Sequence, residues 1–196
     1  MKEYYDKRAP EYDDWYLGRG LFEPRDRVGW DAELEQLFSV ISSLEPGRTL
    51  DVACGTGFLT RHLRGDVVGL DQSKRMLEEA HRQAPSVTCV EGDGLELPFV
   101  DYSFDRVFTG HFYGHLEPPD RERFISEARR VAHELVVVDA SRKHSEVDEH
   151  MSQRVLNDGS TWEVFKRYFT GAGLAEELGG GDVLFEGDYF VVVRSA

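Results

Sequence analysis

The sequence lacks the features that mark several special classes of protein. Its 196 residues include only two cysteines, and no apolar run approaches the ~20 residues of a membrane-spanning helix. Residues 1–6 lack the apolar core of a signal peptide. These absences exclude a cysteine-rich scaffold and an integral membrane protein, and they make the cytosol the expected compartment.

Positive charge is also scarce. Lysine and arginine number 23 against 37 aspartates and glutamates, which gives a formal net charge of −14. A phosphate backbone would meet repulsion rather than release counterions, so the composition argues against DNA, RNA and anionic membranes as partners. Apolar residues at 40% and charged residues at 31% are ordinary for a soluble protein, and the length favours one domain with a sizeable core.

A short apolar run followed by glycines stands at the centre of the chain. Thr49 to Ala53 reads as a buried strand, Gly55-Thr56-Gly57 as a tight turn, and residues 57–64 as the helix that follows. Glycine permits both a sharp turn and the close approach of a ligand to the main chain. Strand, glycine turn and helix are typical of a nucleotide-binding βαβ unit.

Carboxylates follow three successive predicted strands. Asp51 stands near the end of strand 48–53, Asp71 ends strand 66–71, and Asp93 follows strand 87–91. Open α/β sheets bind their ligands at the carboxyl edge, where these acids are expected to meet.

The rest of the chain completes an α/β pattern. Helices are predicted at 25–44, 73–83 with Ser73 as N-cap, and 120–132, and strands at 104–110 and 134–139. Pro24 suits the first turn of the helix that follows it. Residues 141–160 read as a polar excursion, 161–169 as a helix or an extended arm, and 182–186 with 189–194 as a hairpin. Cys54 and Cys89 then lie on strands about 10 Å apart, too far for a disulfide, and their spacing offers no metal pattern.

Residues 46–140 resemble the class I S-adenosylmethionine-dependent methyltransferases. The matching motifs are Asp51 to Gly57, Gly69 to Ser73, Glu91 to Phe99 and Ser103 to Phe108, in the family's order and spacing. The resemblance implies an α/β, Rossmann-like sheet of seven strands in the order 3-2-1-4-5-7-6, with the last strand antiparallel and helices on both faces. It divides one domain, 1–196, into an N-terminal helical lid (1–45), a cofactor-binding core (46–140) and a substrate-side insertion with the terminal hairpin (141–196).

The same resemblance implies S-adenosyl-L-methionine as cofactor and S-adenosyl-L-homocysteine as product. Asp51, Gly55 and Gly57 are expected at its methionine end, Asp71 at the ribose hydroxyls, and Asp93 at the adenine amino group. The other residues expected at the cofactor are Tyr12, Ala53, Gln72, Met76, Gly92, Gly94, Leu95 and Thr109. The alternatives are a helix cap for Asp51, a turn aspartate for Asp71 and a core position for Met76.

Two positions bear on the choice of cofactor. The family often has glycine in place of Ala53, and the alanine is acceptable if its φ is negative. A nicotinamide dinucleotide would call for a third glycine where Thr60 stands, and Asp51 would repel its pyrophosphate. Both points favour S-adenosylmethionine.

Residues 109–116 leave a strand at the same edge and lack the Asn/Asp-Pro-Pro-aromatic signature of nucleic-acid and glutamine N-methylases. That absence and the acidic charge favour a small-molecule acceptor. His111 is the candidate general base, unless it caps the loop or packs over the cofactor. The expected substrate-side residues are Tyr16, Tyr113, His115, Arg154 and Trp162, with His144 and Lys166 as further candidates. Residues 4–16, rich in aromatics, read as a lid or as a docked surface helix, and residues 154–166 as a pocket wall or a structural arm.

The sequence therefore predicts in-line transfer of a methyl group to an oxygen, nitrogen or carbon of a small molecule. Alignment of donor and acceptor supplies most of the rate, which makes a dedicated base optional. The competing hypothesis is a protein that binds S-adenosylmethionine without turnover, as a sensor or as a subunit of a larger complex.

Overall fold

The structure, a computed structural model, describes residues 1–23 and 26–196. The predicted helix start at Pro24 falls outside these ranges, and the described helix runs from Trp30 to Ser43 (α3). The remaining helices and strands are α1 (Lys2–Arg8), α2 (Asp14–Leu17), β1 (Gly47–Val52), β2 (Gly65–Asp71), α4 (Lys74–Gln83), β3 (Thr88–Glu91), β4 (Phe104–Gly110), α5 (Pro118–Val131), β5 (Ala132–Ala140), β6 (Glu149–Val155), β7 (Thr161–Arg167), α6 (Gly171–Glu177), β8 (Asp182–Glu186) and β9 (Phe190–Ser195).

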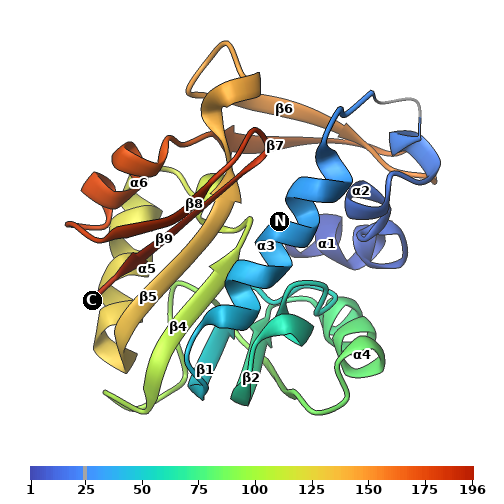
Figure 1. Cartoon of the computed structure of the whole chain (residues 1–196). Coiled ribbons are helices and arrows are strands. Elements are labelled where there is room, and N and C mark those ends of the chain that lie inside the picture. The colour runs from blue at the N-terminus through green and yellow to red at the C-terminus, as the bar shows by residue number, and fades with distance from the viewer. Residues whose placement is uncertain (24–25) are drawn as a thin grey trace.

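Seven strands form one twisted sheet in the order β3-β2-β1-β4-β5-β9-β8 (Figure 1). The first five run parallel, and β9 pairs antiparallel with β5 and with β8. This confirms the predicted fold and strand order, because β9 and β8 take the places expected for strands seven and six. Parallel pairing brings the ends of β1, β2 and β3 to one edge, where Asp71 lies opposite Glu91.

The strands alternate their side chains between two packed layers. Val136 and Val138 of β5 face the layer that contains Leu37 and Ile41 of α3, whereas Leu135 and Val137 face the layer that contains Phe124 of α5. A strand buried on both faces is a continuous apolar run in the sequence, which is why residues 134–139 were recognisable as a strand.

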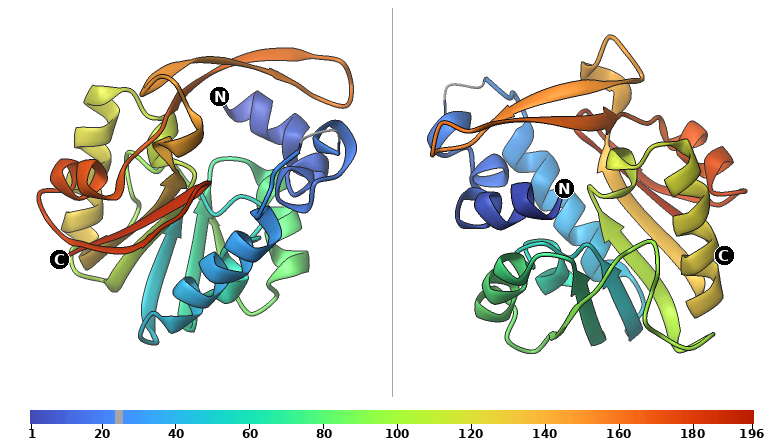
Figure 2. Two further views of the ribbon diagram at one scale, coloured as in Figure 1. Left: turned by 45° about the horizontal axis from the view of Figure 1, so that its top comes forward. Right: turned by 180° about the vertical axis from the view of Figure 1, so that it is seen from behind.

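The N-terminal residues fold as a chain of short helices over the carboxyl edge. Pro10 begins the break between α1 and α2, a stretch with a 3₁₀ turn at Ala9–Glu11. Lys7 pairs with Asp158 at 3.3 Å, and the backbone N–H of Asn157 donates to the Glu11 carboxylate at 2.9 Å. These contacts join the segment to the β6–β7 turn, and in the left view of Figure 2 the hairpin passes over the N-terminal helices.

Two predicted elements were wrong in part. Residues 141–160 contain β6, which pairs with β7 in a separate antiparallel hairpin that arches over the carboxyl edge (Figure 2). The inward positions of β6 are the polar residues Ser152 and Arg154, so apolar and polar residues do not alternate along this strand and no clean period was visible. The predicted helix 57–64 is only a 3₁₀ turn, Thr60–His62, since the chain must enter β2 by Gly65. No helix in the described ranges is long and apolar enough to span a bilayer.

Candidate active site

The carboxyl edge of the sheet opens into two adjoining cavities. The first, of about 270 Å³, lies over the ends of β1, β2 and β3, and the second, of about 240 Å³, lies between the N-terminal helices and the β6–β7 hairpin. Four residues line both: Tyr5, Tyr12, His111 and His115. A ligand in one cavity therefore meets a ligand in the other at these side chains.

The glycine turn after β1 forms the floor of the first cavity. Ala53, Gly55 and Gly57 all have positive φ, of 59°, 56° and 80°. The expectation of a negative φ at Ala53 was therefore wrong, and the alanine is strained by its left-handed conformation. Gly57 lies outside the cavity: a Cβ there would stand 3.2 Å from Cα of Ala80, so this glycine permits the approach of α4.

Asp71 is fixed at the cavity wall by main-chain donors. The N–H groups of Gly55 and Ser73 donate to its two oxygens at 3.0 and 2.9 Å, and the residue is buried. Burial raises the pKa of Asp71, and these N–H donors oppose the rise. A carboxylate has about four acceptor sites, so Asp71 keeps capacity for a ligand's hydroxyl groups.

Asp51 has an unmet hydrogen-bonding demand. Thr60 donates to its Oδ2 at 2.6 Å, but Oδ1 is buried without any partner in the described chain. Burial raises the pKa of Asp51 to about 7. Asp51 lines a further small pocket of about 10 Å³, here called the narrow extension, which shares Tyr12, Ala53 and Gly110 with the lining of the first cavity. A cationic ligand group reaching this extension would satisfy the carboxylate.

The opposite wall is built by the loop after β3. Asp93 accepts the N–H of Leu95 at 2.9 Å and lines the first cavity together with Gly92 and Gly94. A Cβ at Gly94 would stand 2.8 Å from Cγ1 of Val52, so only glycine fits there. Asp71 and Asp93 thus face one hollow, with Asp51 in its extension.

The N-terminal segment is bonded directly to this floor. Asp6 accepts from the Ser73 hydroxyl at 2.6 Å, and Asp13 accepts from Thr56 at 2.5 Å and from Gln83 at 2.6 Å. Tyr5 and Tyr12 of the same segment line both cavities. The segment therefore covers both cavities.

Two neutral histidines stand at the junction. Nδ1 of His115 lies 2.6 Å from the Phe165 carbonyl oxygen, so Nδ1 carries the proton and Nε2 is an acceptor. Burial lowers the pKa of His115 to about 3 and that of His111 to about 4. His111 has a φ of 56°, its Nε2 is buried without a partner, and its ring packs against Trp15 at 5.0 Å.

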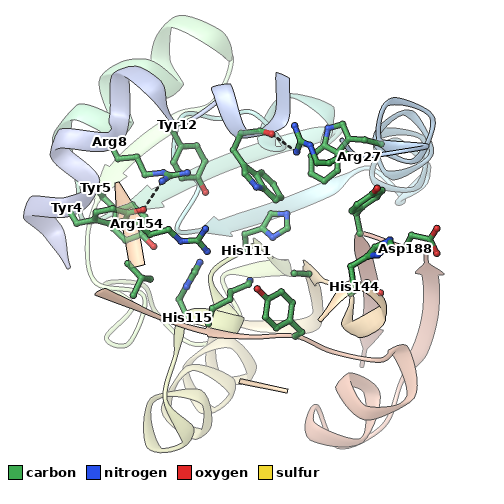
Figure 3. A pocket seen from close by; sticks show the side chains of 18 residues that line it. Tyr4, Tyr5, Arg8, Tyr12, Arg27, His111, His115, His144, Arg154 and Asp188 are labelled. Atoms are coloured by element: carbon green, nitrogen blue, oxygen red, sulfur yellow. Dashed lines mark hydrogen bonds between the residues drawn. The ribbon is translucent and has the colours of Figure 1, made fainter. Parts of the chain in front are cut away.

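The second cavity is rich in polar and cationic side chains. Arg8, Arg154, His111 and His115 line it in Figure 3, with Arg154 between Arg8 and His115 in that view. Lys166 lines it from β7 and pairs with the buried Asp139 at 2.6 Å.

Comparisons with known proteins fit this architecture. A family model described as "Methyltransferase domain" matches residues 49–135. A solved structure described as "DhpI-SAM-HEP complex" is 28% identical, with a TM-score of 0.73 over 98% of this chain and 94% of that chain. Residues 49–135 therefore carry a methyltransferase domain of the S-adenosylmethionine-dependent kind.

Curated methyltransferases are similar over part of their length. A demethylmenaquinone methyltransferase of Thermotoga maritima is 34% identical over 132 residues, which are 65% of this chain and 54% of the relative. A 2-phytyl-1,4-naphtoquinone methyltransferase of Trichormus variabilis is 32% identical over 148 residues, which are 67% of this chain and 59% of the relative. The matches thus span somewhat more than half the length of these two relatives.

The first cavity of this methyltransferase fits S-adenosylmethionine. The partnerless Oδ1 of Asp51 suits the ammonium group of the methionine part, and the remaining acceptor sites of Asp71 suit the ribose hydroxyls. A Cβ at Gly92 or Gly94 would stand 2.8 Å from the side chain of Leu70 or Val52, so these glycines let the wall of the cavity pack closely on the strands. A further solved structure, described as "DhpI-SAH complex structure", is 27% identical with a TM-score of 0.71.

Most of the predicted cofactor residues lie together. The first cavity is lined by Tyr12, Ala53, Gly55, Asp71, Gln72, Met76, Gly92, Asp93, Gly94 and Leu95. Thr109 lies outside it, fully buried, with its hydroxyl donating to the Val52 carbonyl at 2.8 Å. Thr109 therefore ties β4 to β1.

The predicted acceptor residues are divided. His111, His115 and Arg154 line the second cavity, as do His144 and Lys166. Tyr16 stacks on Phe58 at 4.1 Å and borders the narrow extension, and Tyr113 is buried beside Glu177. Trp162 packs against Tyr4 at 5.8 Å. Neither Tyr113 nor Trp162 lines a cavity described here.

Sequence reasoning missed Arg8, Tyr4 and Tyr5 as lining residues of the second cavity. They lie on α1, some 100 residues before the loops they face. The signal available was the cluster of tyrosines around Arg8, in a segment already expected to be a lid.

Proposed function

We propose that this protein transfers the methyl group of S-adenosylmethionine to an oxygen, nitrogen or carbon of a small molecule held in the second cavity. The observation that supports this most is the shared wall: Tyr5, Tyr12, His111 and His115 border both cavities. A donor in one cavity and an acceptor in the other would meet there, as in-line displacement requires.

The protein's own part is mainly to align the two partners. The bound cofactor supplies a methyl group already activated on a sulfonium. Orientation of donor and acceptor lowers the barrier by roughly 7–11 kcal/mol. A general base adds ~10²–10⁴-fold in rate, which is only ~3–5 kcal/mol. The covering N-terminal segment and the rigid floor around Asp71 serve that alignment.

We propose His115 alongside His111 as the candidate proton acceptor. His115 presents an unprotonated Nε2 because its Nδ1–H is held by the Phe165 carbonyl. His111 is more enclosed, between Trp15, Tyr16 and Phe190. His115 is therefore the better placed of the two to receive a proton from an acceptor hydroxyl or amine.

The rival hypothesis of a binding protein without turnover has less support. A sensor needs only the cofactor cavity, whereas this chain holds a second cavity of about 240 Å³ beside it. The quinones in the relatives' names fit this cavity less well than a polar acceptor does, because three cationic side chains, Arg8, Arg154 and Lys166, stand among its aromatic walls.

The test is formation of S-adenosylhomocysteine, measured by mass spectrometry, from S-adenosylmethionine and a panel of small metabolites. Wild-type protein is expected to form it with some members of the panel. His115→Gln is expected to lower kcat by about 10²–10⁴-fold with unchanged affinity for S-adenosylhomocysteine. His81→Gln, an exposed change on α4, is the control.

The outcomes separate the two parts of the proposal. Undiminished turnover in His115→Gln would contradict the role of His115 as the base without contradicting methyl transfer. Absence of product across the panel, with S-adenosylhomocysteine still bound, would favour the sensor instead.

A further inference from the structure

The second cavity carries a charge opposite to that of the whole protein. Arg8, Arg154 and Lys166 line it, with Arg27 held at its rim by the Trp15 carbonyl and the Trp30 ring. Among the described residues Asp188 is the one carboxylate that lines it, and Asp188 is paired with Lys143 at 3.3 Å. A chain of net charge −14 has thus gathered cations around one hollow.

Arg8 is buried without an acidic partner. Its side chain is 8% exposed, its Nη1 donates to the Tyr4 hydroxyl at 2.8 Å, and the guanidinium lies over the Tyr12 ring at 5.4 Å. No carboxylate within the described residues forms an ion pair with it. A buried charge is costly unless it is paired, so this one calls for a counter-charge from outside the chain.

The acids nearest to Arg8 in sequence are turned elsewhere. Asp6 accepts from Ser73, Asp13 from Thr56 and Gln83, and Glu11 from the backbone of Asn157. The carboxylates of the N-terminal segment therefore bond to the core and to the β6–β7 hairpin and not to Arg8. Arg8 is left as the charge that faces the cavity.

Arg154 supplies a second unpaired guanidinium from the other side. It is half-buried on β6, and no hydrogen bond or ion pair of its side chain occurs within the described chain. It lies opposite Trp162 in the hairpin, and Val164 and Lys166 of β7 line the same cavity. Figure 3 shows its guanidinium reaching into the space between Arg8 and His115.

Lys166 is a third cation, and it is held in place. Asp139, fully buried at the end of β5, accepts from Nζ at 2.6 Å and also from the N–H groups of Gly114 and Ala140 at 2.7 and 2.8 Å. An ammonium has three donors, so two remain for a ligand. Asp139 acts as the positioning residue of this lysine.

We propose that the methyl acceptor is a small organic anion whose oxyanion group is bound between Arg8, Arg154 and Lys166. That the bound anion is the methyl acceptor rests on the proposed function. The anion-binding site itself is argued from the three cations alone. Arginine pairs with carboxylate and phosphoryl oxygens through a planar fork, and both groups fit this chemistry. The Tyr5 and Tyr12 phenols add donors, because burial raises the pKa of both and keeps them protonated.

The first experiment measures anion binding without turnover. Protein saturated with S-adenosylhomocysteine is titrated with sodium phosphate, sodium acetate or glycerol at constant ionic strength. The readout is the fluorescence of Trp15 and Trp30, which line the cavity. We expect saturable binding of phosphate or acetate and none of glycerol, and the stronger of the two anions distinguishes a phosphoryl from a carboxylate ligand.

Arg154→Gln is expected to weaken that binding by about tenfold to a hundredfold, and Arg154→Lys by less. Arg75→Gln removes the same charge from the exposed face of α4 and is expected to bind as wild type. In Arg8→Met the increase in Tm that the anion causes is expected to disappear. Equal binding by Arg154→Gln and Arg75→Gln, or no saturable binding by wild type, would overturn the anion site.

The second experiment separates this inference from methyl transfer itself. Each carboxylate or phosphate in the acceptor panel is paired with its neutral amide or ester, and S-adenosylhomocysteine is measured for both. Product from the anions alone supports the inference. Equal product from the neutral partners contradicts it while methyl transfer stands, and anion binding without any product contradicts methyl transfer while the site stands.

Discussion

Individual residues with unmet hydrogen-bonding or charge requirements mark both cavities. Oδ1 of Asp51 and Nε2 of His111 are buried without partners among the described residues, and neither Arg8 nor Arg154 pairs with an acid there. Such groups are costly in a packed interior, so their concentration at one edge of the sheet indicates ligands that complete them.

The pKa of Asp51, raised to about 7 by burial, predicts pH-dependent cofactor binding. Only the ionised carboxylate attracts an ammonium, so affinity for S-adenosylhomocysteine is expected to rise as pH increases from 6 to 8, with proton release on binding. Calorimetry in two buffers of different ionisation enthalpy measures that release. Asp51→Asn is expected to bind more weakly and without it, and a flat pH profile in wild type would contradict the assignment.

The left-handed φ of Ala53 predicts a stabilising substitution. Ala53→Gly removes the clash between Cβ and the main chain, and the free energy of unfolding is expected to rise by about 1 kcal/mol. Ala84→Gly, where φ is −132°, is expected to lower it instead. Denaturant unfolding measures both, and a loss of stability in Ala53→Gly would show that the turn is not strained.

At the scale of elements, the N-terminal helices form a cover over both cavities, and the β6–β7 hairpin adds to this cover over the second. Asp13 joins this cover to the floor through Thr56 and Gln83. In Asp13→Ala we expect faster hydrogen exchange in residues 2–17 and about tenfold weaker binding of S-adenosylhomocysteine.

Asp14→Ala is the matched control, since the neighbouring carboxylate makes no such bond within the described residues. Wild-type exchange rates in Asp13→Ala would show that the cover closes without this contact.

Elements whose buried positions are apolar were predictable, whereas the β6–β7 hairpin, whose inward positions include Arg154 and Lys166, was not. The apolar runs of β1, β2 and β5 and the N-cap of α4 at Ser73 were read correctly from sequence. The β6–β7 hairpin was not predicted, because its pairing depends on contacts with α1. The short turn after Gly57 was not predicted, because its length is set by the entry of the chain into β2. Local pattern records burial, whereas these two elements are shaped by distant partners.

At the scale of the molecule, the same contrast separates the two ligand sites. The first cavity is built from strand ends and their adjoining turns, close together in sequence order, so its acids and glycines were predictable as a motif. The second is assembled from α1, the loops after β4 and β5, and the hairpin, and the role of Arg8 emerges only when these meet. The net charge of −14 gives no sign of the cations that gather around this cavity.

The account depends most on the first cavity holding S-adenosylmethionine through Asp71. Calorimetric titration with S-adenosylhomocysteine tests this directly, with Asp66→Asn, at the exposed far end of β2, as control. We expect one site per chain in wild type and in Asp66→Asn, and at least about tenfold weaker binding in Asp71→Asn. No binding by wild type, or equal binding by Asp71→Asn, would contradict the account.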